Sequence, residues 1–339
     1  MGLTRRQMLL GTLAAAGGAA LAGCGGGGGQ AGGAAPEGAA AEGFPVTLDH
    51  KFGRTTIPAP PQRVVSIGYS DHDAVLALGV PVVGVRYWYG DENAVIQPWA
   101  TEAVQRTGSR PTVLNMTSPD PEKIAALRPD LIIGIYSDLT QQSYDQVSAI
   151  APVVAAPAQF NDYGVPWQDS TRLTGRAVGR SAQAEELVAG LEARFAAARD
   201  ANPQWAGKEV AVATRSADKF GVFASQDLRP RFFTSLGFVT PPRYDELAGD
   251  TGFNADLSFE QAAELDRDLL VWDQLSFTPG GRATVQNDPL VSRLAAVRDG
   301  RVVYLEGATE NAFGWQTVLS LPAALDGVVP LVEKALPRT

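Results

Sequence analysis

The feature that most limits how this chain can fold is a series of short apolar runs that alternate with segments of helical spacing. RVVSIG at residues 63–68 is typical of a buried parallel strand, DAVLALGV at 73–80 has the spacing of a helix, and PVVGV is typical of a strand again. The alternation continues through residues 118–134 and 144–154. Strands and helices that alternate across short polar turns predict an α/β fold with a parallel, doubly wound sheet.

The same pattern occurs a second time downstream. EVAVAT opens it as a strand, and PRFFTSLGFVTPP, LSFEQAAELDRDLLVW and DPLVSRLAAVRDGRVVYL each have the pattern of a helix followed by a strand. Alignment of PEKIAALRPDLIIG with FEQAAELDRDLLVW places Glu122 opposite Glu260, each at the start of a helix that leads into an apolar strand. The repeat predicts two similar lobes rather than one continuous sheet.

Residues 167–200, between the two halves, have a helix-forming composition and apolar residues at helical spacing, namely Leu173, Ala177, Leu187, Leu191 and Phe195. Gly179 predicts a break, after which Ser181 is suited to cap a second helix. A helical connector of this kind would hold the lobes at a nearly fixed separation and leave a cleft with little hinge freedom.

The N-terminus has the pattern of an export signal rather than of a folded segment. Arg5 and Arg6 precede an uncharged run, Met8–Ala22, that glycines dilute, and the only cysteine, Cys24, follows. TRRQMLL resembles a twin-arginine signal, and LAGC resembles the lipobox of bacterial lipoproteins, which implies that residues 1–23 are removed and that Cys24 is lipidated. The Gly- and Ala-rich residues 24–43 predict a flexible tether.

Charge and residue usage argue against several classes of function. A net charge of -9 does not suit the binding of nucleic acid. With His50 and His72 as the only histidines and Cys24 as the only cysteine, a zinc site is hard to build, so we expect no metal site. Ser70, Asp71 and His72 are adjacent in sequence, which is not the arrangement of a catalytic triad. We expect no catalytic residues, and an exported α/β enzyme is the second hypothesis.

Residues expected to hold a ligand follow the predicted strands, because doubly wound sheets bind ligands beyond the carboxyl ends of their strands. They are mostly aromatic or cationic: Tyr69, Arg86, Tyr87, Trp88, Tyr89, Tyr136, Arg215, Lys219, Trp272 and, after a further loop, Trp315. Arginine and aromatic rings together suit a bulky, partly anionic, unsaturated ligand, through charge-assisted hydrogen bonds and stacking.

Six blocks along the chain resemble, in their order and spacing, the periplasmic-binding-protein family that serves ferric-siderophore and cobalamin ABC importers. They are RVVSIGYSDHDAVLALGVPVVGV, PDPEKIAALRPDLIIG, YDQVSAIAPVV, GRAVGRSAQAEELVAGL, FFTSLGF and LSLPAALDGVVPLV, and they span Val64 to the C-terminal region. The resemblance implies two Rossmann-like lobes bridged by a long helix. We place the lobes at residues 44–165 and 201–339 and the helical connector at residues 166–200.

The resemblance also implies partners and roles. A protein of this kind is a lipoprotein that hands its ligand to an ABC permease and its ATPase, and Glu122 and Glu260 match the acidic residues that dock onto the permease. The positions that match the family's ligand contacts are Arg86, Tyr87, Trp88, Tyr136, Arg215, Trp272 and Trp315. We expect a monomer held by its lipid on the outer face of the cytoplasmic membrane, and we favour a Gram-positive cell surface over a periplasm.

The implied ligand is a ferric siderophore. Ferric tris-catecholates are strongly anionic and call for several converging cations, whereas ferric hydroxamates are near neutral and rely on aromatic side chains. Two arginine candidates and many rings favour a hydroxamate or mixed chelate. Cobalamin stays open, and haem is disfavoured because it usually needs an axial His or Tyr. Because the siderophore coordinates its own iron, we expect no protein metal ligand and no resident cofactor.

Overall fold

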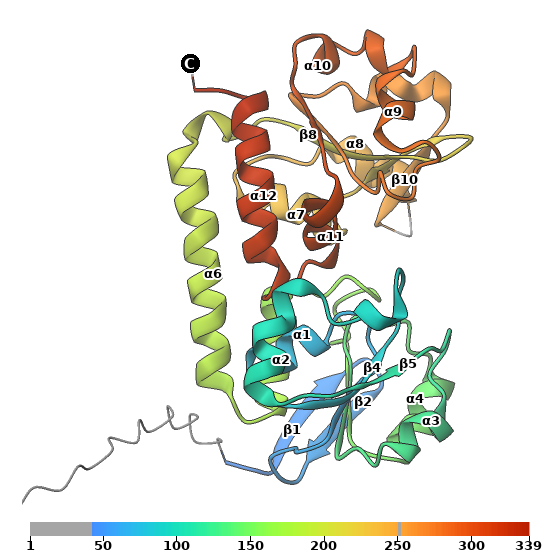
Figure 1. The fold of residues 1–339 in the computed structure, drawn as a ribbon, viewed down its shortest axis with the longest axis vertical. Helices are drawn as coiled ribbons and strands as arrows, with labels where there is room; N and C mark the ends of the chain where they lie inside the picture. The colour runs from blue at the N-terminus through green and yellow to red at the C-terminus, as the bar shows by residue number, and fades with distance from the viewer. Residues whose placement is uncertain (1–42, 250–251, 339) are drawn as a thin grey trace, which may run out of the picture. The chain divides into compact units, whose positions relative to one another are not determined.

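The computed structural model describes residues 43–249 and 252–338. The predicted export signal over residues 1–23, the predicted lipidation site Cys24 and the tether up to residue 42 lie outside these ranges. The described residues belong to one compact unit, and they fold into two α/β lobes that a helical connector joins (Figure 1). The predicted fold class is therefore confirmed.

The N-terminal lobe is built on a five-stranded parallel sheet with the order β5-β4-β3-β6-β7. Its strands are β3 (Val64–Ser66), β4 (Val82–Arg86), β5 (Thr112–Leu114), β6 (Leu131–Gly134) and β7 (Val153–Ala155). The helices are α1 (His72–Ala77), α2 (Thr101–Thr107), α3 (Pro121–Ala126) and α4 (Gln141–Ser148), with the short 3₁₀ turns η1 (Glu92–Ala94) and η2 (Pro98–Ala100). A hairpin that we did not predict, β1 (Val46–His50) with β2 (Gly53–Ile57), precedes the sheet.

The C-terminal lobe has a second five-stranded sheet with the order β10-β9-β8-β11-β12. Its strands are β8 (Val210–Arg215), β9 (Phe220–Phe223), β10 (Asn254–Leu257), β11 (Leu269–Trp272) and β12 (Val302–Tyr304). The helical segments are η3 (Pro203–Trp205), α7 (Leu228–Ser235), α8 (Pro242–Ala248), η5 (Phe259–Leu265), α9 (Gly281–Gln286), η6 (Val291–Arg293), α10 (Ala295–Arg298), α11 (Gly307–Trp315) and α12 (Ser320–Ala335). In both lobes the first strand is central, the next two extend to one side and the last two to the other, so the two lobes are similar, as the sequence repeat predicts.

The second sheet is not wholly parallel, which corrects the prediction. β9 runs antiparallel to both β8 and β10. Only residues 216–219 separate β8 from β9, and so short a connection closes a hairpin, whereas a parallel crossover needs about a dozen residues or more. The strand expected after α7 is also absent from the described sheets, since residues 237–240 contribute only the single bridge from Glu209 to Val239.

The connector consists of α5 (Trp167–Ala177) and α6 (Ser181–Ala201), with Gly179 between them at a φ of 67°. Ser181 does not cap α6, because the cap position is Arg180 and no side chain there accepts a hydrogen bond. The 21 residues of α6 give a length of about 31 Å, so the helix runs along both lobes beside α12 (Figure 1). An ion pair from Arg194 to Asp326, at 2.7 Å, joins α6 to α12.

No helix in the described part of the chain combines the length and the apolar character that crossing a membrane requires.

We predict opposite effects for two glycines of the connector. A Cβ atom on Gly175 would lie 2.4 Å from Cβ of Ala184 on α6, so Gly175→Ala is expected to destabilise the protein by about 1–3 kcal/mol by forcing the two helices apart. Gly190 is exposed within α6 and has open space around it, so Gly190→Ala is expected to stabilise by about 0.5–1 kcal/mol. Urea unfolding of the two variants measures both, and equal effects would contradict the packing argument.

Candidate functional site

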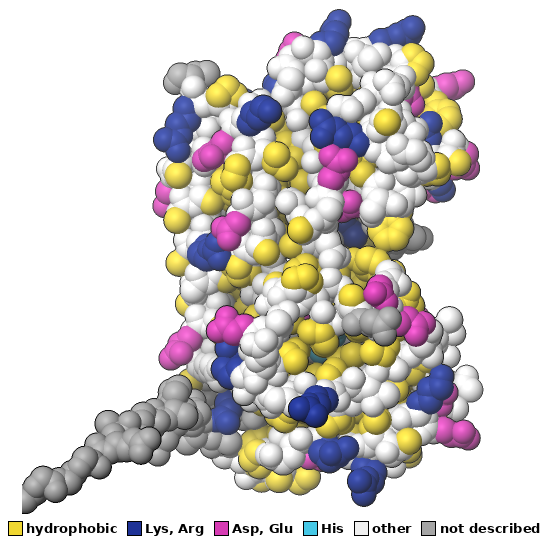
Figure 2. Space-filling view, in the orientation of Figure 1, with side chains coloured by type: hydrophobic (Ala, Val, Ile, Leu, Met, Phe, Trp, Pro, Cys, Tyr) yellow, Lys and Arg dark blue, Asp and Glu magenta, His cyan; other side chains and the backbone are white. Residues whose placement is uncertain are grey.

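A cavity of about 770 Å³ lies between the two lobes, beyond the carboxyl ends of strands β4 and β11. Figure 2 shows the surface hollowed between the two halves of the molecule, with hydrophobic side chains beside the hollow. The N-terminal lobe lines the cavity with Trp88, Tyr89, Gly90, Asp91, Ala94 and Gln97. The C-terminal lobe lines it with Arg229, Asp273, Gln274, Ser276, Phe277, Gly307, Glu310, Asn311 and Gly314.

Aromatic rings from both lobes form one wall of the cavity. Trp88 and Tyr89 follow β4, and their ring centroids lie 4.9 Å apart in an edge-to-face arrangement. From the C-terminal lobe Phe277, which is 62% exposed, lies edge-on to Tyr89 at 5.5 Å. So large an exposed ring at the mouth of a cavity offers apolar surface to a ligand, and edge-to-face neighbours hold such rings in place.

A polar network joins the lobes behind these rings. The hydroxyl of Tyr89 donates to Asn311 Oδ1 at 3.1 Å and accepts from Trp315 Nε1 at 3.0 Å. Asn311 Nδ2 in turn donates to Gln97 Oε1 at 2.6 Å. Deeper between the lobes, Thr317 donates to the buried carboxylate of Asp73 at 2.6 Å. These hydrogen bonds connect side chains of α11 and the segment after it to the N-terminal lobe.

The cation on the cavity wall is Arg229, the only Lys or Arg among the described residues that line it. Its Nε donates to Asp273 at 2.8 Å, and its Nη1 lies 3.3 Å from Asp227, the residue that caps α7. Burial acts to lower the pKa of Arg229, but the two carboxylates outweigh it and raise that pKa. Burial raises the pKa of Asp273 to about 6, with Arg229 opposing the shift. Arg229 is thus a permanent cation held between two acids.

Of the predicted ligand residues, Trp88 lines the cavity and Trp315 lies directly behind it. The rings of Trp88 and Trp315 are 5.7 Å apart, and Trp315 is 3% exposed. Tyr136 lines a separate cavity of about 20 Å³ and lies edge-on to Trp88 at 6.0 Å. Tyr87 does not line the large cavity, since its hydroxyl donates to the carbonyl of Gly90 and its ring packs on the core of the N-terminal lobe.

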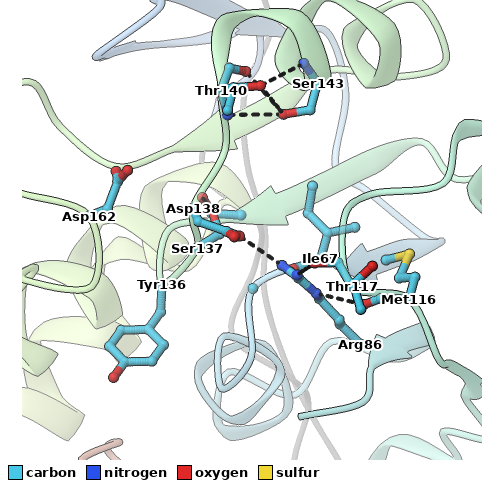
Figure 3. Close-up of polar contacts among 12 residues, drawn as sticks. Ile67, Arg86, Met116, Thr117, Tyr136, Ser137, Asp138, Thr140, Ser143 and Asp162 are labelled. Atoms are coloured by element: carbon cyan, nitrogen blue, oxygen red, sulfur yellow. Dashed lines mark hydrogen bonds and ion pairs between the residues drawn. The ribbon is translucent and has the colours of Figure 1, made fainter.

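Arg86, which the sequence predicts as a ligand-binding cation, does not line the large cavity. Its side chain is fully buried, and the guanidinium donates to the carbonyls of Ile67 and Met116 at 3.4 and 3.3 Å and to that of Thr117. It also pairs with Asp138 at 3.2 Å, while Tyr136 points away from it (Figure 3). The guanidinium lies 4.2 Å from the ring of Tyr69. Burial and four hydrogen bonds therefore make Arg86 a structural cation.

Arg215 and Trp272 are also placed away from the cavity. Arg215 pairs with Asp288 at 3.5 Å and lies 4.4 Å from the ring of Phe259, while Trp272 is fully buried in the core of the C-terminal lobe. Each residue ends a strand, as expected. The side chain of Arg215 packs inside the lobe against Asp288 and Phe259, and that of Trp272 packs in the apolar core. A position at the end of a strand does not fix the direction of the side chain.

The cavity-lining residues that sequence reasoning missed come from helices α7 and α11 and from the loop after β11, not from the strand ends. Arg229 is in the first turn of α7, and Phe277 and Glu310 belong to the loop after β11 and to α11. The aromatic run RYWY includes Tyr89, so the sequence did contain that signal. Arg229 could not be found in this way, because we searched only the residues that follow predicted strands, and Arg229 is in the first turn of a helix.

Of the adjacent Ser70, Asp71 and His72, the two ionisable side chains are buried in structural contacts. Asp71 accepts hydrogen bonds from the backbone of Ile135 at 2.7 Å and of Tyr136 at 3.0 Å, and burial raises its pKa to about 6. The His72 ring is fully buried edge-on to Trp315. Asp71 therefore holds the loop that carries Tyr136, which is the role of a backbone cap.

Glu122 and Glu260 are both exposed and occupy matching places in the two lobes. Glu122 is in α3, which Asp120 caps by accepting from the backbone of Glu122 at 3.1 Å. Glu260 is in η5, which begins with a capping box between Ser258 and Gln261. The helices that carry them precede β6 and β11, which hold equivalent places in the two sheets.

Comparison with known families and curated proteins gives a consistent result. Residues 64–309 match the model of the family described as periplasmic binding protein. A probable siderophore-binding lipoprotein of Bacillus subtilis (strain 168), YfiY, is 30% identical over 233 residues, which cover 67% of this chain and 68% of that protein. The Fe(3+)-citrate-binding protein YfmC of the same organism is 25% identical over 265 residues, which cover 77% of this chain and 78% of that protein.

Solved structures share the fold over nearly their whole length. A periplasmic solute binding protein from Mycobacterium smegmatis superposes with a TM-score of 0.74 at 31% identity, covering 86% of this chain and 98% of that one. PiaA of Streptococcus pneumoniae TIGR4, solved in complex with ferrichrome, superposes with a TM-score of 0.73 at 27% identity, with the same coverage of both chains.

We predict that stability falls with rising pH in part because of Asp273. Its pKa is about 6 in the folded protein against an ordinary 3.8, so the contribution of its protonation is complete below pH 3.8 and is lost as the pH rises through 6. Asp273→Asn removes this contribution. Thermal unfolding from about pH 4 to about pH 7 should therefore show a smaller loss of stability in the variant than in the wild type. Equal losses would contradict the assignment.

Proposed function

We propose that this chain, which belongs to the periplasmic binding protein family, captures a ferric siderophore outside the cell and delivers it to an ABC importer. The observation that carries the proposal is the aromatic-walled cavity of about 770 Å³ between two lobes that α6 connects. A cavity of this size suits a bulky chelate rather than a single ion or a small metabolite. The chain is a substrate-binding protein, not an enzyme.

The chemistry of the wall supports a chelate that is not strongly anionic. Tyr89, Trp88 and Phe277 offer ring faces and edges, whereas Arg229 is already paired with acids. Because Arg86 and Arg215 are engaged inside the lobes, the cavity lacks the converging cations that a ferric tris-catecholate would need. A ferric hydroxamate or mixed chelate is therefore favoured, and the names of the relatives, which include siderophore and ferric-citrate binding, agree with an iron chelate.

The siderophore would coordinate the iron by itself, so the protein would act through ring contacts and hydrogen bonds and would need no cofactor of its own. Cobalamin and haem are the alternatives within the same family. Neither described histidine lines the cavity, and Tyr89, the tyrosine that does, is engaged with Asn311 and Trp315. To serve as an axial ligand of haem iron, Tyr89 would have to give up its hydrogen bonds with Asn311 and Trp315, which disfavours haem.

We propose that Glu122 and Glu260, the two matching acidic positions, dock the protein onto the permease, which works with its ATPase. Both are exposed, each stands in the first turn of a helical segment, and neither has an ion-pair partner within 4 Å among the described residues. Export by the twin-arginine signal, a lipid on Cys24 and a monomer on the outer face of the cytoplasmic membrane complete the proposal; the relatives named as lipoproteins support the anchor.

The first test is a tryptophan-fluorescence titration of the purified protein with ferric hydroxamates, ferric catecholates, haem and cobalamin. Trp88 lines the cavity and Trp315 packs against Trp88. A bound ferric chelate should therefore quench the fluorescence of both tryptophans saturably, with a Kd of about 1 μM or lower. The iron-free siderophore serves as the control and is expected to bind more weakly. A flat response to every ferric chelate would overturn the proposed function.

A second test separates docking from binding. Glu122→Arg combined with Glu260→Arg should abolish uptake of the iron chelate by cells while the Kd of the purified protein stays within about twofold, because both side chains are exposed and neither lines the cavity. Glu102→Arg, at an exposed position of α2 outside the matched pair, is the control and should retain uptake. Normal uptake by the double variant would rule out the docking role.

A further inference from the structure

The charges that line the large cavity do not balance. Asp273 and Glu310 line it with buried carboxylates, and Arg229 supplies the one cation among the described lining residues. Arg229 is also paired with Asp227 outside the lining, so two acids already share its charge. The wall that a ligand meets is therefore acidic as well as aromatic.

Glu310 is the carboxylate that this imbalance leaves without a cation. It lies in α11, is only 8% exposed, and contributes to the cavity wall. Its Oε1 accepts hydrogen bonds from the backbone nitrogen of Ser276 at 3.0 Å and from the Ser276 hydroxyl at 2.7 Å. In the described part of the chain no Lys, Arg or His lies within 4 Å of this carboxylate, and Oε2 accepts no hydrogen bond there.

A carboxylate that is nine-tenths buried beside aromatic rings has lost most of its contact with water, so a cation that enters the cavity would replace the lost solvation. The two hydrogen bonds from Ser276 hold Glu310 in place and occupy one oxygen, which leaves the other for a donor from the cavity. The neighbouring rings of Tyr89 and Phe277 favour the same kind of group, because aromatic faces attract cations. Both features suit a positively charged substituent.

We propose that the transported chelate carries an ammonium group that donates to Glu310, and that Glu310 thereby determines specificity. This inference rests on the proposed function and adds the charge of the substrate to it. The iron centre of a ferric trihydroxamate is neutral, since the hydroxamate anions balance the ferric charge, so a pendant amine makes the whole chelate cationic. A ferric tris-catecholate would instead place its negative charge against Asp273 and Glu310.

The test compares two ligands that differ only in this group. Ferrioxamine B has a pendant ammonium, and its N-acetylated derivative has the same ferric centre without the charge. Wild-type protein should bind ferrioxamine B about tenfold or more tightly than the acetylated form, as expected for a partly desolvated charge-assisted hydrogen bond. In Glu310→Gln the preference should fall to about twofold or less, with the affinity for the acetylated form unchanged.

Glu306→Gln is the matched control, because Glu306 precedes the same helix but pairs with Arg282 and does not line the cavity. It should keep the wild-type preference. Equal binding of the two chelates by the wild type, or a preference that survives in Glu310→Gln, overturns the inference while leaving the proposed function intact. If the wild type binds no ferric chelate at all, the proposed function fails as well. Should Glu310→Gln unfold, the comparison within the wild type decides.

Discussion

The carboxyl edge of the N-terminal sheet depends on one buried cation. Arg86 ends β4 and donates to carbonyls that follow β3 and β5, while Asp138, after β6, supplies the counter-charge. A charge buried this deeply is tolerated only when its donors are satisfied, so the surrounding loops are held in one arrangement. The ring centroid of Tyr69 lies 4.2 Å from the guanidinium carbon of Arg86 and 5.3 Å from the ring centroid of Trp88. Arg86 therefore supports Trp88, and with it the cavity wall, through Tyr69.

Sequence reasoning located the edge where the cavity lies but not the side chains that face it. Buried runs such as Val64–Ser66 and Leu131–Gly134, and their repetition downstream, were sufficient to predict two lobes and a connector. The hairpin of β8 and β9 was missed because residues 220–223 were not recognised as a strand. Arg86 and Arg215 could not be distinguished from ligand contacts, since their partners come from residues distant in sequence.

The arginines at the strand ends and on the cavity wall are mostly used for structure. Arg86 and Arg215 neutralise acids within their lobes, and Arg229 is held by Asp227 and Asp273. A count of arginines at strand ends therefore overstates the positive charge that a ligand would meet. Burial and pairing of these arginines are visible only in the folded chain, and they leave a cavity wall that is aromatic and acidic rather than cationic.

Helix α6 packs with Ala184 in the core of one lobe and with Leu191 and Phe195 in the core of the other. A single rigid rod anchored in both cores resists the large hinge rotation by which many two-lobed proteins enclose a ligand. The empty and loaded forms of this protein would then have nearly the same outline. A permease that distinguishes the two forms would then have to recognise local differences at the mouth of the cavity. Without such recognition, the empty protein would compete with the loaded protein for the permease.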